Sequence, residues 1–172
     1  MPLPVQFDQN EWFVIIALII SYSIIIYLPK KIPFSIFVLI SVYALLIARM
    51  YDHMIASPTV DYYDIMDTTK YDLFDLLLYL LYPPFGYLFI YFYERWGIKG
   101  YLTLLYILIW SLLGMGFEYL ASYFQVFQYK GWKIFYSFTV YLFTQSLTLS
   151  LYLLVKNIYN KVKRQSMQRV QE

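Results

Sequence analysis

Five apolar stretches in this chain are each long enough to cross a lipid bilayer as a helix. They run at about residues 12–28, 32–49, 71–93, 101–121 and 133–155, and a crossing needs about 20 mostly apolar residues, with about 17 as the lower limit. Only 14% of the residues are charged, against about 25% in soluble domains. A soluble chain of 172 residues cannot bury that much apolar surface. The sequence predicts an all-α integral membrane bundle of five transmembrane helices in a single domain, 1–172.

The basic residues between these stretches predict how the chain is oriented. Nine of the thirteen lysines and arginines fall on one side of the membrane: Lys30, Lys31, Arg95, Lys99, Lys156, Lys161, Lys163, Arg164 and Arg169. The other side has four, namely Arg49, Lys70, Lys130 and Lys133. Cytoplasmic connections carry the excess of basic residues, so we expect the N-terminus outside and the C-terminus in the cytoplasm. The segment 51–70 is then an outer loop, and 156–172 is a basic cytoplasmic tail.

Polar residues recur at helical spacing within three of the apolar stretches, in the half nearer the outer side. The third stretch has Asp72, Asp75, Tyr79 and Tyr82 at steps of three, four and three, which places them on one face of a helix. The fourth has Glu118, and the fifth has Tyr141 and Gln145. If these faces turn inward, they form a polar cavity that opens outward. The candidate ligand- or proton-binding residues are Asp72, Asp75, Glu118, Arg49, Tyr79, Tyr82, Tyr141 and Gln145.

Each acidic candidate also has a structural interpretation. Asp72 and Asp75 lie in the first turns of their helix, where the helix dipole favours carboxylates. Glu118 lies far from the N-terminus of its helix, so this explanation does not apply to it. Its structural alternatives are an ion pair with Arg49 or Lys133, or a protonated carboxyl group that is hydrogen-bonded within the bundle. Ionisable residues at membrane depth are costly and often functional.

Prolines and glycines predict local features of the helices. Pro83 and Pro84 remove two backbone donors near the middle of the third stretch, so we expect a kink there and freed carbonyl groups that need partners. Gly114 and Gly116 are expected to let a neighbouring helix approach closely.

Several chemistries find no support in the sequence. The chain has no cysteine and only one histidine, His53, and it contains none of the short catalytic or nucleotide-binding motifs. A net charge of +2 does not indicate a nucleic-acid partner. We expect no cofactor and no metal site. Whether the acidic loop binds a cation stays open, and its residues are Asp52, His53, Asp61, Asp64 and Asp67.

A set of residues between Arg49 and Tyr152 gives the chain a family resemblance. The acidic third stretch followed by Tyr82-Pro83, together with Glu118, Trp132 and Tyr141, resembles an uncharacterised family of small, tyrosine-rich, multi-pass membrane proteins of spore-forming Gram-positive bacteria. The resemblance implies a bacterial plasma membrane. It implies no activity, cofactor or functional residue.

Three functional hypotheses follow, in order of preference. The first is a non-enzymatic protein, transporter-like or sensor-like, whose outward-facing cavity binds or passes a small solute or a proton. The second is an accessory subunit that packs against a larger membrane complex or a second copy of the chain. The third is an intramembrane enzyme that acts on a lipid or isoprenoid substrate with carboxylates as acid and base.

Overall fold

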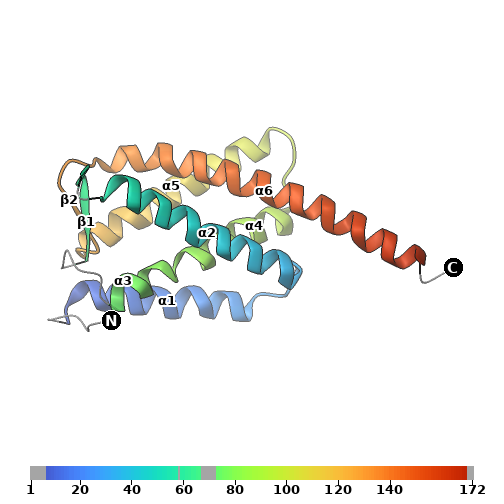
Figure 1. Ribbon diagram of the computed structural model, residues 1–172, viewed down its shortest axis with the longest axis horizontal. Helices are drawn as coiled ribbons and strands as arrows, with labels where there is room; N and C mark the ends of the chain where they lie inside the picture. Colours follow the sequence, from blue (N-terminus) through green and yellow to red (C-terminus); the bar gives the residue numbers. More distant parts are fainter. Residues whose placement is uncertain (1–6, 58, 67–72, 170–172) are drawn as a thin grey trace.

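The chain forms a bundle of helices with a small sheet at one end (Figure 1). The computed structural model describes residues 7–57, 59–66 and 73–169. Its helices are α1 (Gln9–Tyr27), α2 (Phe34–Ile55), α3 (Leu73–Tyr79), α4 (Tyr82–Trp96), α5 (Leu102–Tyr123) and α6 (Ile134–Arg169), and its strands are β1 (Tyr63–Ile65) and β2 (Phe127–Tyr129). With α3 and α4 taken together, five helical segments are long and apolar enough to span a membrane. The mostly helical membrane fold is therefore as expected.

The first two helices both extend beyond their apolar stretches. Asp8 caps α1 with its side chain, and Glu11 completes a capping box, so α1 begins three residues before the apolar stretch. Helix α2 continues six residues past Arg49, to Ile55. The apolar stretch ends at the arginine, but helical hydrogen bonding does not require apolar side chains. The expected loop 51–70 is therefore shorter, and it begins after the last turn of α2.

The third span is divided into α3 and α4 by the two prolines. Leu80 and Leu81 separate the helices, and Pro83 and Pro84 occupy the first turn of α4. Pro84 cannot donate to the carbonyl of Leu80, which is four residues earlier. That carbonyl instead accepts a hydrogen bond from the hydroxyl of Tyr22 in α1, at 3.1 Å. The predicted kink is thus a complete break, and a neighbouring helix supplies the missing donor.

The two strands pair antiparallel and were not expected from the sequence. Tyr63 lies opposite Tyr129, and Ile65 lies opposite Phe127. The backbone carbonyl of Tyr62 also accepts hydrogen bonds from the amides of residues 130–132. The sheet joins the connection after α2 to the connection after α5. We call this end of the bundle the sheet end.

Helices α5 and α6 pack closely against each other along the bundle (Figure 1). A Cβ placed on Gly114 would lie 3.1 Å from the ring of Tyr141, so this glycine does allow a close approach. Gly116 has nothing within 4 Å of such a Cβ, and the corresponding expectation for it was wrong. Helix α6 is 36 residues long and continues through most of the expected tail. That segment is rich in good helix formers and contains no glycine or proline.

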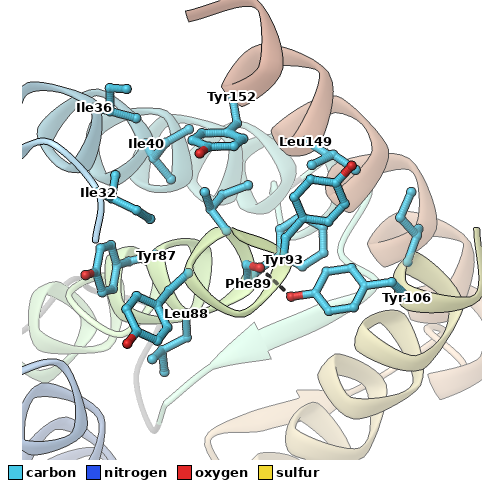
Figure 2. Close-up of a cluster of buried hydrophobic side chains, with 13 residues drawn as sticks. Ile32, Ile36, Ile40, Tyr87, Leu88, Phe89, Tyr93, Tyr106, Leu149 and Tyr152 are labelled. Carbon is cyan, nitrogen blue, oxygen red and sulfur yellow. Dashed lines mark hydrogen bonds between the residues drawn. The ribbon is translucent and has the colours of Figure 1, made fainter. Parts of the chain in front are cut away.

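The main core cluster lies around α4 (Figure 2). Isoleucines of α2 and tyrosines of α4 pack together there, and the hydroxyl of Tyr106 donates to the carbonyl of Phe89. Helices α2 and α4 approach closely at Gly86, where an added Cβ would lie 3.2 Å from the Cβ of Ala44. This packing fixes α2 and α4 against each other and thereby positions the polar residues at the sheet end.

Candidate functional site

A cavity of about 110 Å³ lies beneath the sheet, between α2, α4, α5 and α6. The helices contribute polar side chains to its wall: Tyr51, Asp52, Tyr82, Glu118, Ser137, Tyr141 and Thr144. The sheet and its flank cover it with four aromatic residues, Tyr63, Phe127, Tyr129 and Trp132, which we call the aromatic cover. We call the whole site the carboxylate cavity, because two acidic side chains from different helices line it.

Asp52 is placed in this cavity by the regular face of α2. The buried residues of α2 recur at every fourth position: Ile36, Ile40, Ala44, Ala48 and Asp52. Asp52 is only 7% exposed. It accepts hydrogen bonds from the hydroxyl of Tyr63 at 2.5 Å and from that of Tyr79 at 2.7 Å. Arg49 donates in turn to the hydroxyl of Tyr79 at 3.1 Å, which links its positive charge to the carboxylate through a tyrosine.

Glu118 is contributed to the cavity by α5. Its Oε1 accepts hydrogen bonds from Tyr129 at 2.6 Å and from Ser137 at 2.5 Å. Trp132 donates to the same serine oxygen through Nε1 at 2.8 Å. Among the described residues, neither Arg49 nor Lys133 forms an ion pair with Glu118. Of the structural alternatives for this residue, hydrogen bonding within the bundle is therefore the one that the geometry shows.

The two tyrosines of the cover are held in their neutral form. Burial, followed by the neighbouring carboxylate of Asp52, raises the pKa of Tyr63 far above its usual range. Burial and Glu118 raise the pKa of Tyr129 in the same way. A neutral hydroxyl donates a hydrogen bond to a carboxylate, whereas a phenolate would repel it. The aromatic cover therefore supplies fixed donors to both carboxylates.

A second cavity and an outer groove adjoin this site. The second cavity, also about 110 Å³, shares Tyr82, Glu118, Phe127 and Tyr141 with the carboxylate cavity. Its remaining wall is mainly apolar, with Gln145 as a polar contributor. A groove of about 660 Å³ runs along α1 and shares Phe85 and Phe117 with the second cavity. We call it the α1 groove. Its lining is almost entirely apolar.

The structure brings together most of the residues that the sequence singled out. Tyr82, Glu118 and Tyr141 line both cavities, and Gln145 lines the second. Tyr79 and Arg49 reach the site through Asp52. Asp75 is buried in α3, 5% exposed, and is not among the described residues that line either cavity. Asp72 lies outside the described residues. A binding role for each of these side chains stays a prediction.

Sequence reasoning missed Asp52 and the tyrosines of the cover. Asp52 was assigned to the outer loop, although the four-residue spacing from Ile36 was available as a signal. Tyr63 and Tyr129 lie in strands of three residues, which are too short to show an alternating pattern. Trp132 gives no sequence signal for its contact either, because its indole nitrogen donates to Ser137 in the next helix.

The acidic residues of the outer connection do not form a cation site in the part of the chain that is described. Asp61 and Asp64 both contact Lys130, at 2.7 and 2.9 Å. His53 is exposed, and Asp67 lies outside the described residues. No group of three His, Cys, Asp or Glu side chains within the described ranges is arranged to hold a metal ion.

Comparison with protein-family models, with curated proteins and with solved structures found no match. The resemblance to the tyrosine-rich family of spore-forming bacteria therefore stays a prediction. A functional assignment for this membrane protein rests on the geometry of the carboxylate cavity.

Proposed function

We propose that this protein binds a small cationic solute, or a proton, in the carboxylate cavity. The observation that carries the proposal is that Asp52 and Glu118, from different helices, line one cavity of about 110 Å³. The described residues that line it include no lysine, arginine or histidine. Asp52 is buried and Glu118 is half-buried, and placing two such carboxylates at one cavity is unfavourable unless their charge is compensated. A bound cation provides that compensation.

The aromatic cover favours the same class of ligand. Tyr63 and Trp132 both line the cavity, with ring centroids 6.3 Å apart. Aromatic faces attract ammonium groups through the ring quadrupole. An alkylammonium ion therefore fits the site better than an anion or a neutral sugar does. With the N-terminus outside, as the basic residues predict, the cavity lies on the outer side of a bacterial plasma membrane.

Trp132 provides a direct assay, because it lines the cavity. Replacing Trp12, Trp96 and Trp110 by Phe leaves Trp132 as the sole tryptophan of the four in the chain. Propylammonium chloride is titrated into this protein in phosphatidylglycerol nanodiscs, with sodium chloride matching the ionic strength. We expect a saturable change in emission and at least tenfold weaker binding in Glu118→Gln. A pH titration of the emission tests the proton in the same samples.

A matched control removes a carboxylate at the same end but outside the cavity. Asp61 is half exposed and pairs with Lys130, so Asp61→Asn should bind propylammonium within twofold of the parent protein. If neither propylammonium nor pH produces a transition that depends on Glu118, the proposal is wrong. If Glu118→Gln lowers only the stability of the protein, Glu118 is a structural residue.

The accessory-subunit hypothesis is weakened at one of the residues on which it was based. The ring of Tyr141 within the same chain already covers Gly114, so that glycine is not available to a partner helix. Native mass spectrometry in mild detergent separates the two hypotheses. A stoichiometric protein partner would support the accessory role, and a monomer that binds propylammonium would support the proposal above.

A further inference from the structure

The α1 groove is a large apolar hollow on the described surface of the bundle. At about 660 Å³, it is six times the size of either cavity. Its walls come from α1, from Phe85 and Leu88 of α4, and from the last turns of α5. All three helices belong to membrane spans. The groove therefore faces the hydrocarbon of the bilayer rather than water.

Shared residues connect this groove to the carboxylates. Phe85 and Phe117 line both the groove and the second cavity, and their ring centroids lie 4.6 Å apart. Glu118 follows Phe117 directly in the chain and lines both the second cavity and the carboxylate cavity. Two adjacent residues of α5 thus lie between the apolar groove and the polar site. The phenylalanine pair is the only part of the wall that these two hollows share among the described residues.

The three hollows also change in polarity along this route. The carboxylate cavity has acidic and aromatic walls, the second cavity has one carboxylate at an otherwise mainly apolar wall, and the groove is apolar. A molecule that matches the polarity of the carboxylate cavity, the second cavity and the α1 groove has a positive head and a hydrocarbon tail. The head replaces its water by carboxylates and ring faces, and the tail remains in an apolar medium throughout.

We infer that the ligand of the carboxylate cavity is an amphiphilic amine, with its ammonium head at Asp52 and Glu118 and its tail in the α1 groove. This inference rests on the proposed function and adds the chemical class of the ligand. The ligand reaches the site laterally from the bilayer, past Phe85 and Phe117. The amine belongs either to a single-chain amphiphile or to the headgroup of an amine-bearing lipid.

The test compares dodecylammonium with propylammonium on groove variants. Ala17→Phe introduces a ring into the α1 groove, and Ile16→Phe does so at a neighbouring position on the same wall without adding a second tryptophan to the assay. Ile19→Phe is the matched control, because Ile19 is 62% exposed on the same helix and does not line the groove. Each affinity is expressed as the ratio of variant to parent protein in the same phosphatidylglycerol nanodiscs. This ratio cancels the partitioning of the tail into the bilayer.

We expect both groove variants to weaken dodecylammonium at least tenfold more than they weaken propylammonium, and Ile19→Phe to leave both affinities within twofold. The inference is overturned if the groove variants affect the two amines equally. It is also overturned if Ile19→Phe weakens dodecylammonium as strongly as they do. If propylammonium itself fails to bind the parent protein, the proposed function fails first, and the two failures are thereby distinguished. Thermal unfolding in detergent verifies that each variant is folded. If one groove variant does not fold, the other carries the test.

Phosphatidylethanolamine in the nanodisc distinguishes the two sources of the amine. Competition with dodecylammonium assigns the ammonium group to a lipid headgroup. Undiminished binding assigns it to a single-chain amphiphile. In both cases the chemistry at Asp52 and Glu118 is the same.

Discussion

Tyr63 and Tyr129 lie directly opposite each other across the two-stranded sheet, and each donates a hydrogen bond to a different carboxylate. Tyr63 reaches Asp52 on α2, and Tyr129 reaches Glu118 on α5. Their rings meet edge to face, with centroids 6.5 Å apart. One pair of facing residues therefore connects two walls of the cavity. The pairing of the strands and the position of the carboxylates depend on each other.

This dependence predicts that the two tyrosines are energetically coupled. Tyr63→Phe and Tyr129→Phe should each lower the free energy of unfolding by about 1.5–3 kcal/mol, the usual range for a hydrogen bond to a charged group. The double variant should lose less free energy of unfolding than the two single variants together, because removing one hydrogen bond already loosens the sheet that both tyrosines share. Reversible unfolding in mixed micelles measures all four proteins. Strict additivity would show that the two donors act independently.

The raised pKa values of the same tyrosines predict a loss of stability in alkaline solution. In the unfolded chain a tyrosine loses its proton near pH 10, whereas Tyr63 and Tyr129 keep theirs well above that pH in the folded protein. The unfolded state then binds fewer protons, so the free energy of unfolding falls as the pH rises above about 10. Each such tyrosine contributes a slope of about 1.4 kcal/mol per pH unit.

The measurement compares this slope in the parent protein and in the Tyr63→Phe/Tyr129→Phe double variant between pH 10 and 11.5. The double variant should have a shallower slope, because its unfolding releases up to two fewer protons in this pH range. An unchanged slope in the double variant would contradict the prediction.

Two glycines of α5 predict opposite outcomes for the same substitution. Gly116→Ala should stabilise the protein by up to about 1 kcal/mol, because alanine favours a helix and the added Cβ meets nothing within 4 Å. Gly114→Ala brings a Cβ to 3.1 Å from the ring of Tyr141. The ring must then shift, which offsets the gain and displaces a residue of both cavities. Thermal unfolding of the two variants, measured side by side, checks the sign.

Two buried tyrosines of the core cluster make another matched pair. Tyr91 is fully buried, and its hydroxyl has no hydrogen-bond partner among the described residues. Tyr91→Phe should leave the stability unchanged or raise it by about 1–2 kcal/mol, because an unsatisfied buried hydroxyl is costly. Tyr106→Phe removes a donor from the carbonyl of Phe89 (Figure 2) and should lower the stability by about 1 kcal/mol. Equal losses in both variants would contradict this assignment.

The spans were predictable because the length of an apolar stretch is a strong signal in a membrane protein. An interruption near Pro83 was predictable for a similar reason, since a missing backbone donor has a fixed position in the sequence, although the sequence predicted a kink and the structure has a break. Glu118 stood out because a carboxylate late in an apolar helix has no local explanation. In each case one physical constraint acts within a single segment. Recognising it requires no knowledge of which neighbouring helix packs against that segment.

The rest of the site depends on contacts between segments that lie far apart in the sequence. Asp52 looked like a loop residue because Arg49 ended the apolar stretch, although the buried face of α2 continues to it. The strands with Tyr63 and Tyr129 have three residues each, and their pairing joins positions more than 60 residues apart. Neither length nor periodicity encodes such a pair. Only the folded arrangement shows that two tyrosines and two carboxylates form one unit.

The ladder between residues 63–65 and 127–129 also restricts how the bundle can move. The strand pairing connects the segment after α2 to the segment after α5. Lys130 reinforces this connection through ion pairs with Asp61 and Asp64. Separating the helices at that end requires these hydrogen bonds to break, whereas α1 is not joined to the sheet and packs on α5 through the rings of Phe13 and Phe117. Slow fluctuations of the bundle should therefore move α1 away from the other helices, while the sheet end stays fixed and acts as the hinge.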